Sequence, residues 1–146
     1  MEDTYLSFLD SLKNKKIDGK YLSLPLTNEQ YQLLKGKNGG AYFGPSSILI
    51  LGGKNDFNGL GSFMNFRQGV TKALQEKNFD LLRFYFSIFN IRYAIHNADN
   101  YIYDNFPTYP YSDELKKIFP DQDSIKDFIN ELGYKEIDKV GQFSIY

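Results

Sequence analysis

The most apolar stretch of the sequence runs from Phe79 to Asn97 and reads FDLLRFYFSIFNIRYAIHN. Over its first half, apolar side chains cover most of a helix circumference, which predicts a helix that is buried on several sides. Asn90 suits the end of this helix because asparagine tolerates a left-handed backbone. From Ile91 the residues alternate with a period of two, so a strand is predicted to begin almost at once. A helix joined so closely to a strand is expected to pack back against the sheet that the strand enters.

The residues before this stretch predict two helices and a strand. The helices cover 3–14 and 63 to about 76, and both have apolar residues at helical spacing. The strand is Tyr21–Leu26, whose leucines alternate and so face one way. Between this strand and the second helix we expect a helical turn that Thr27 or Asn28 caps and that continues to Leu34, followed by a glycine-rich loop over Gly36–Gly44. Ile48–Leu51 should form a short buried strand, and a short helix is the alternative.

The residues after this stretch are expected to be irregular from 98 to 120, apart from a short helix from Ser112 to Ile118. A further helix should begin at Asp121 or Asp123 and end at Gly133. Two strands, Tyr134–Val140 and Gln142–Tyr146, should form a hairpin that turns at Gly141. These elements predict a single α/β (or α+β) domain over residues 1–146. Its sheet should be mixed, with Tyr21–Leu26 and Ile91–His96 as central strands.

The composition excludes several classes of function. The net charge is −1, from 17 basic and 18 acidic residues with no basic stripe, which argues against nucleic acid as a partner. The chain has no cysteine, so it cannot form disulfides, thiolate nucleophiles or cysteine-ligated metal sites. The longest uncharged apolar run, Phe84–Ile91, is far shorter than the roughly 18 residues of a membrane span.

His96 is the single histidine of the chain, and it is the strongest candidate for acid–base chemistry. It lies at the end of a predicted strand, where ligands bind in open α/β sheets, and Asn97 and Asp99 follow it closely. A structural or surface histidine is the alternative, and a lone histidine favours that alternative. The sequence contains no phosphate-binding loop, dinucleotide fingerprint or nucleophile elbow, and its acidic residues are too scattered for a metal site. No catalytic residue, cofactor or metal is therefore assigned.

The aromatic residues offer a binding surface instead. The chain has 13 Phe and 12 Tyr, and five aromatic residues lie in the irregular segment between Tyr101 and Tyr111. Exposed tyrosine rings can stack on sugars or on a protein partner, although these rings could also fold back over the core. The candidate ligand-binding residues are Tyr42, His96, Asn97, Asp99, Tyr101 and Tyr103.

Four segments in a fixed order resemble a known family. They are the Leu-Pro strand at 21–26, the segment GGAYFGPSS at 39–47, the strand FNIRYAIHNAD at 89–99, and the final hairpin from Leu132 to Tyr146. This order resembles the extracytoplasmic C-terminal domain of bacterial multi-pass membrane proteins of the GT-C glycosyltransferase type, including YfhO-like proteins. The resemblance covers about residues 20–146, and residues 1–19 form an additional helix and turn.

In that family the catalytic carboxylate lies in a membrane-proximal loop of the transmembrane part, which has no counterpart in this sequence. The resemblance therefore implies a non-catalytic soluble domain that contacts glycan, lipid-linked sugar or a membrane-embedded partner region. It also implies an extracytoplasmic location. No secretory signal is visible, so a cytoplasmic location is expected if the chain is complete. The alternatives are a protein-interaction module that forms homo-oligomers, and a small enzyme that uses His96 with Asp99.

Overall fold

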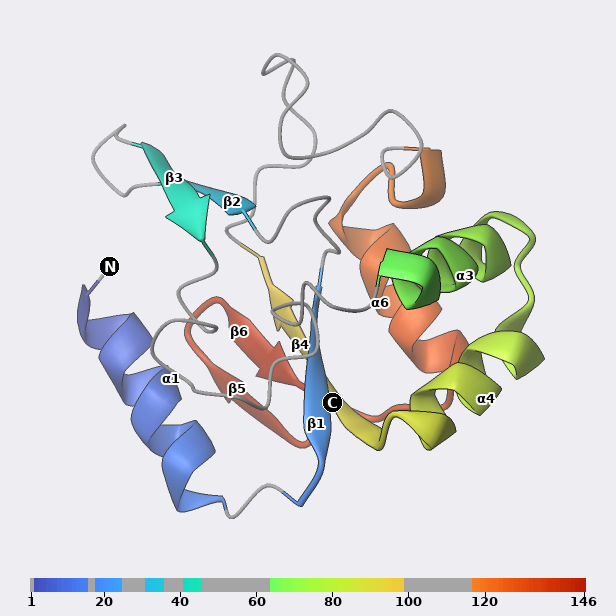
Figure 1. Ribbon diagram of the computed structural model, residues 1–146. Coiled ribbons are helices and arrows are strands. Elements are labelled where there is room, and N and C mark those ends of the chain that lie inside the picture. Colours follow the sequence, from blue (N-terminus) through green and yellow to red (C-terminus); the bar gives the residue numbers. More distant parts are fainter. Residues whose placement is uncertain (1, 16–17, 25–30, 36–40, 46–63, 99–116) are drawn as a thin grey trace.

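The computed structural model describes residues 2–15, 18–24, 31–35, 41–45, 64–98 and 117–146 (Figure 1). Its helices are α1 (Glu2–Asn14), α3 (Met64–Gln75), α4 (Phe79–Ile88) and α6 (Gln122–Glu131). Its strands are β1 (Lys20–Leu24), β2 (Tyr31–Lys35), β3 (Ala41–Pro45), β4 (Ile91–Asn97), β5 (Asp138–Val140) and β6 (Phe143–Ile145). The predicted strand over 48–51 and most of the predicted helix over 112–118 lie outside the described residues.

The main sheet has four strands in the order β1-β4-β6-β5. Strand β1 runs parallel to β4, whereas β6 is antiparallel to both of its neighbours. The predicted mixed sheet and C-terminal hairpin are thus confirmed, and the chain has an α/β fold. The prediction that β1 is a central strand is wrong for the described residues, because β1 lies at one end of the strand order. Strand β6 of the hairpin, rather than a strand from the first half of the chain, flanks β4 on its other side.

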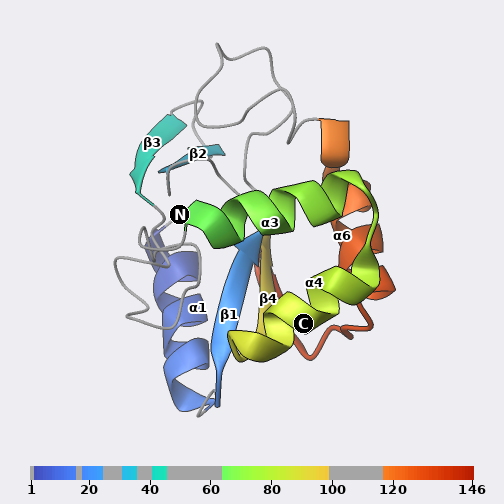
Figure 2. The same cartoon turned by 45° about the vertical axis from the view of Figure 1, so that its right-hand side comes forward.

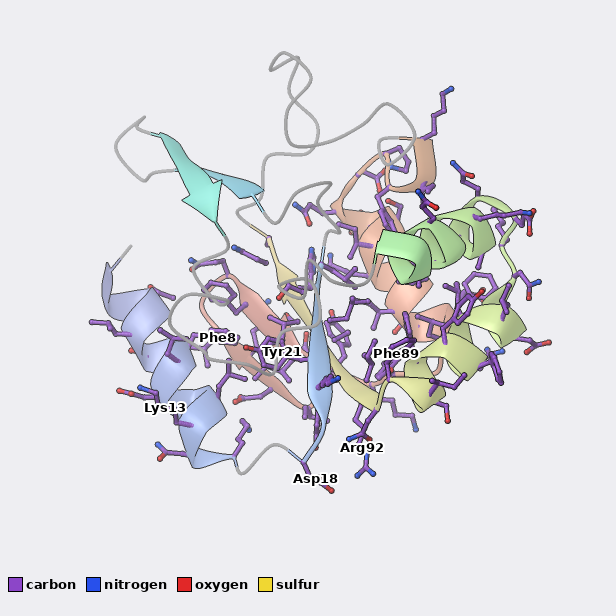
Figure 3. All side chains as sticks on the ribbon, viewed as in Figure 1. Phe8, Lys13, Asp18, Tyr21, Phe89 and Arg92 are labelled. Carbon is purple, nitrogen blue, oxygen red and sulfur yellow. The ribbon has the colours of Figure 1, made fainter. Side chains whose placement is uncertain are left out.

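Helices cover both faces of this sheet (Figures 1 and 2). Helix α1 lies on one face, where its buried Phe8 points toward the sheet (Figure 3) and packs with Ile95 and Phe143. Helices α3, α4 and α6 lie on the other face, where Leu82 and Ile129 pack with Ala94 of the sheet. Successive residues of a strand point to opposite faces, so β4 supplies side chains to both cores.

The stretch from Phe79 to Asn97 forms the predicted helix and strand. Helix α4 begins at the N-cap Asn78, whose side chain accepts a hydrogen bond from the backbone N–H of Leu81 at 3.1 Å. Asn90 has a φ of +55°, as predicted, and β4 begins at the next residue. An exposed ion pair joins the start of β4 to the residues before β1, where Arg92 Nη1 lies 2.9 Å from Asp18 Oδ2. Figure 3 labels both side chains.

The prediction that this helix is buried on several sides is wrong. Leu82 and Phe86 are buried, but the side chains of Phe84 and Ile88 are 58% and 59% exposed. Three helices share one face of a four-stranded sheet, so α4 contacts the core through a single side. The apolar residues on its other side form an exposed stripe.

Two predictions between β1 and α3 are also corrected. In the described part of the expected helical turn, residues 31–34 are instead in the strand β2, and part of the expected loop over Gly36–Gly44 is the strand β3. These strands pair in an antiparallel two-stranded sheet in which Leu34 lies opposite Tyr42. Cross-strand hydrogen bonds stabilise this pair, and a pattern confined to either segment does not reveal them.

The local signals around α6 and the hairpin are confirmed. Asp121 is the N-cap of α6 and forms a capping box with Ser124, whose backbone N–H donates to the carboxylate at 2.7 Å. Gly133 follows the helix with a φ of +89°, and Gly141 turns the hairpin with a φ of +58°. Both glycine positions were predicted from residue type, and Asp121 was one of two predicted N-caps, because aspartate and glycine have strong local preferences.

Lys77 follows the end of α3 with a left-handed backbone, at φ +52°. Its N–H donates to the carbonyl of Leu74 at 3.0 Å, and the next N–H, of Asn78, donates to Ala73 at 2.8 Å. This is the hydrogen-bond pattern of a helix end that favours glycine. We therefore expect Lys77→Gly to raise the free energy of unfolding by about 1 kcal/mol, measured by urea denaturation. Lys77→Ala keeps the left-handed strain, so an equal gain from alanine would contradict this explanation.

Candidate functional site

Strands β1 and β4 are parallel and end at the same edge of the sheet, which is the site that the sequence predicts. Leu24 at the end of β1 lies opposite His96 of β4, and Ser144 of β6 lies opposite His96 on the other side. Four polar residues in these three strands are buried, namely Ser23, His96, Asn97 and Ser144. Buried polar groups require hydrogen-bond partners, so this edge is a polar region within an otherwise apolar core.

His96 is 2% exposed and is held by α6. Its Nε2 forms a short hydrogen bond with Oε1 of Gln122 in the first turn of α6, and Gln122 Nε2 donates to the carbonyl of Ala98 at 3.2 Å. Because the amide oxygen accepts, the imidazole carries its proton on Nε2 in this assignment. The contact ties the end of β4 to the start of α6. This arrangement favours a positioning role for the ring within the fold.

Burial lowers the pKa of His96 below its ordinary value of 6.5. The hydrogen bond that His96 donates to Gln122 raises the pKa and opposes this effect, whereas the positive charges of Lys126 and Lys139 add to the lowering. The imidazole is therefore neutral at pH 7. A neutral, buried and hydrogen-bonded histidine is suited to joining two elements of structure.

The chain has one histidine, so the His96 ring resonance can be followed by NMR without assignment. We expect its titration midpoint to lie below 6.5. The unfolded chain then binds the proton more readily than the folded chain, so the free energy of unfolding should fall as the pH decreases below about 6.5. The fall should stop once the pH is below the folded-state pKa. A midpoint at or above 6.5 in the folded protein would contradict this account.

Of the other candidate residues, the structure describes Asn97 and Tyr42. Asn97 is 1% exposed and lies in register with Phe143, so it belongs to the face that α1 covers, opposite to that of His96. Tyr42 lies in β3, in a separate sheet. Asp99, Tyr101 and Tyr103 lie outside the described residues. Of the six candidates, the structure therefore places two at the predicted edge, and they point to opposite faces.

A pocket of about 760 Å³ lies between the end of α3, the start of α4 and α6, and the sequence did not predict it. This volume is typical of small-molecule sites. Residues from three separate segments line it, namely Leu74, Gln75, Lys77 and Phe79; Lys117, Ile118, Phe119 and Pro120; and Ser124, Asp127, Phe128 and Glu131. We call it the α3–α6 pocket.

The floor of the α3–α6 pocket is aromatic and its rim is charged. The ring of Phe128 lies 6.3 Å from that of Phe79 and 5.4 Å from that of Phe119, edge to face in the second case. The rim has two cations and two anions, Lys77, Lys117, Asp127 and Glu131. Ion pairs within the described part of the chain use none of these four side chains.

One sequence signal could have indicated this pocket. Ser124, Asp127 and Glu131 are spaced three and four residues apart beside Phe128, so one side of α6 presents a polar row next to an aromatic ring. On the sequence alone, that row is indistinguishable from an ordinary solvated helix face. The facing residues of α3 and of 117–120 can be identified only from the folded chain.

The described residues offer neither a metal-binding cluster nor a membrane-spanning helix. No group of three or more His, Asp or Glu residues among them is placed to hold a metal ion. None of the helices in these ranges combines the length and the apolar character that a bilayer crossing requires.

The comparisons with known proteins add no relative. No family model, no curated protein and no solved structure matches the chain. The resemblance to the soluble domain of GT-C-type glycosyltransferases therefore stays a prediction from the sequence.

Proposed function

We propose that this chain is a non-catalytic binding domain, related to the soluble part of GT-C-type membrane glycosyltransferases, that contacts a glycan or a lipid-linked sugar. The observation that carries the proposal is the pairing of segments that bear the resemblance. Strand β1 comes from the Leu-Pro segment and pairs with β4 from the segment 89–99, so that Leu22 lies opposite Ala94. The final hairpin supplies β6 on the other side of β4. Three of the four segments are thus neighbours in one sheet.

The environment of His96 supports the non-catalytic part of the proposal. Its Nε2 is engaged by Gln122, its pKa is lowered, and its ring is almost fully buried. A general base must reach the proton that it removes, and this ring is directed into the fold. The edge of the sheet then contributes to a binding surface rather than to chemistry.

The proposal is tested by NMR titration of the ¹⁵N-labelled chain with trisaccharides of glucose, mannose, galactose and N-acetylglucosamine. We expect one of them to shift the backbone signals of Asn97 and Ala98 in a saturable way. The backbone signals of Asn90 and Ile91, at the opposite end of β4, serve as the internal reference. Absence of saturable shifts with all four sugars, and with a short-chain polyprenyl phosphate sugar, would overturn the proposal.

A second function, a homodimerisation module, is favoured by the exposed stripe on α4. Phe84 and Ile88 are four residues apart on one side of that helix and are both more than half exposed. Light scattering after size-exclusion chromatography should then give a molecular mass that rises with protein concentration. The Phe84→Ser variant should keep the monomer mass at every concentration. A monomer at every concentration would exclude this function.

A further inference from the structure

Side chains of both charges line the α3–α6 pocket. Asp127 and Glu131 come from α6, together with Ser124. The other segments supply the cations Lys77 and Lys117 and the amide of Gln75. The floor between them is formed by buried Leu74, Phe119 and Phe128 and by half-buried Phe79 and Ile118. A ligand that complements this pocket has an apolar group and one charge of each sign.

A smaller polar hollow of about 560 Å³ adjoins the pocket and shares Lys77, Phe79 and Glu131 with it. Arg83 fixes this hollow, because its guanidinium donates to the carbonyl of Glu131 at 2.6 Å and to the carboxylate of Asp80 at 2.8 Å. Arg83 thus links α4 to the last residue of α6 beside the pocket. The charges of Lys77 and Glu131 stand where the apolar pocket meets the polar hollow.

Lys77 lines both the pocket and the hollow from an unusual backbone position. It has a left-handed backbone at a helix end where glycine is the favoured residue. Residues that break a local preference are concentrated at functional sites, where the side chain has a use that the fold does not require. At this position, lysine supplies a cation on the rim of the pocket.

We propose that the α3–α6 pocket binds a free apolar α-amino acid such as phenylalanine or leucine. The apolar side chain lies against Phe79, Phe119 and Phe128. The ammonium group is held by Asp127 and Glu131, and the carboxylate by Lys77 and Lys117. This site is separate from the sheet edge to which we assign the glycan, and it stands whether or not glycan binding is found.

Calorimetry and NMR titration with L-phenylalanine and L-leucine test the proposal, with three analogues that each remove one charge. N-acetyl-L-phenylalanine lacks the ammonium group, L-phenylalanine amide lacks the carboxylate, and 3-phenylpropanoate lacks the amino group. We expect saturable binding of the amino acids that shifts the backbone signals of Leu74 and Lys77. Each analogue should bind about tenfold more weakly, since each loses a charge-assisted contact. Absence of binding by both amino acids overturns the proposal, as does equal binding by 3-phenylpropanoate, which identifies a simple carboxylate amphiphile.

Variants separate loss of a contact from damage to the fold. Lys77→Gly removes the cation while improving the backbone, so it should bind phenylalanine several-fold more weakly although it unfolds at a higher urea concentration. Asp127→Asn should weaken binding by about tenfold. Asp10→Asn and Lys135→Gln are matched controls, because both side chains are exposed and lie outside the pocket. Unchanged affinity in both Lys77→Gly and Asp127→Asn would show that the ligand binds elsewhere.

Discussion

Replacing Phe8 with alanine is expected to lower the free energy of unfolding by about 3–5 kcal/mol. Phe8 is fully buried, and its ring stacks on that of Phe143 with centroids 4.2 Å apart and planes 15° apart. This stacking joins α1 to β6, and the smaller core on that face is built around it. Alanine would leave a cavity in a cluster with few other residues to fill it. The loss is a large part of the roughly 5–15 kcal/mol by which domains of this kind are stable.

Leu6→Ala is the matched control, because Leu6 lies on the same helix and is 55% exposed. Its effect should be less than about 0.5 kcal/mol. The chain lacks tryptophan, so urea unfolding of both variants is best followed by circular dichroism or tyrosine fluorescence. Equal effects of the two substitutions would show that α1 does not dock on the sheet through Phe8.

Replacing Gly141 with alanine is expected to lower the free energy of unfolding by about 3 kcal/mol, for two reasons. The backbone at Gly141 is left-handed, with φ +58°. A Cβ atom at this position would also lie 2.3 Å from Cγ2 of Thr4, which is far inside van der Waals contact. The hairpin turn therefore packs against the first turns of α1 with no room for a methyl group.

The two causes can be separated with two further variants. Gly133 also has a positive φ, and a Cβ there would have no neighbour within 4 Å, so Gly133→Ala reports the cost of the backbone alone. Thr4→Ser removes Cγ2, so it should restore about 1–2 kcal/mol to the Gly141→Ala variant while changing the parent little. Strictly additive effects of Gly141→Ala and Thr4→Ser would contradict the contact.

The sequence predicted those parts of the fold that depend on neighbours along the chain. Asn90 ends a helix and Asp121 begins one through preferences that operate within a few residues. Asn90 was identified from residue type, and Asp121 was one of two alternatives, the other being Asp123. The pairing of β2 with β3 and the end position of β1 depend on segments that meet only in the folded chain. The exposed Phe84 and Ile88 show the same limit, because an apolar residue does not reveal whether the surface it faces is occupied.

The candidate site likewise combines a residue that local sequence identifies with contacts between segments that are distant along the chain. His96 was singled out correctly as the residue at the end of a central strand, but its partner Gln122 is 26 residues away and nothing local connects them. The α3–α6 pocket was missed for a related reason. Lys77 and Asp127 each read as ordinary solvated residues, and they line one pocket only because α3 and α6 share a face of the sheet.

The connection between the parallel strands β1 and β4 can vary in length during evolution at little cost in stability. These strands are neighbours in the sheet but are separated by all the residues between Leu24 and Ile91. The entropy lost on closing a long connection grows only with the logarithm of its length, so doubling the connection costs only about 0.6 kcal/mol. Relatives with much longer or shorter segments between β1 and α3 would keep nearly the same stability, although pairing between distant strands slows folding. Insertions and deletions in this fold are therefore expected to accumulate between β1 and α3, while the spacing between α4 and β4 stays fixed.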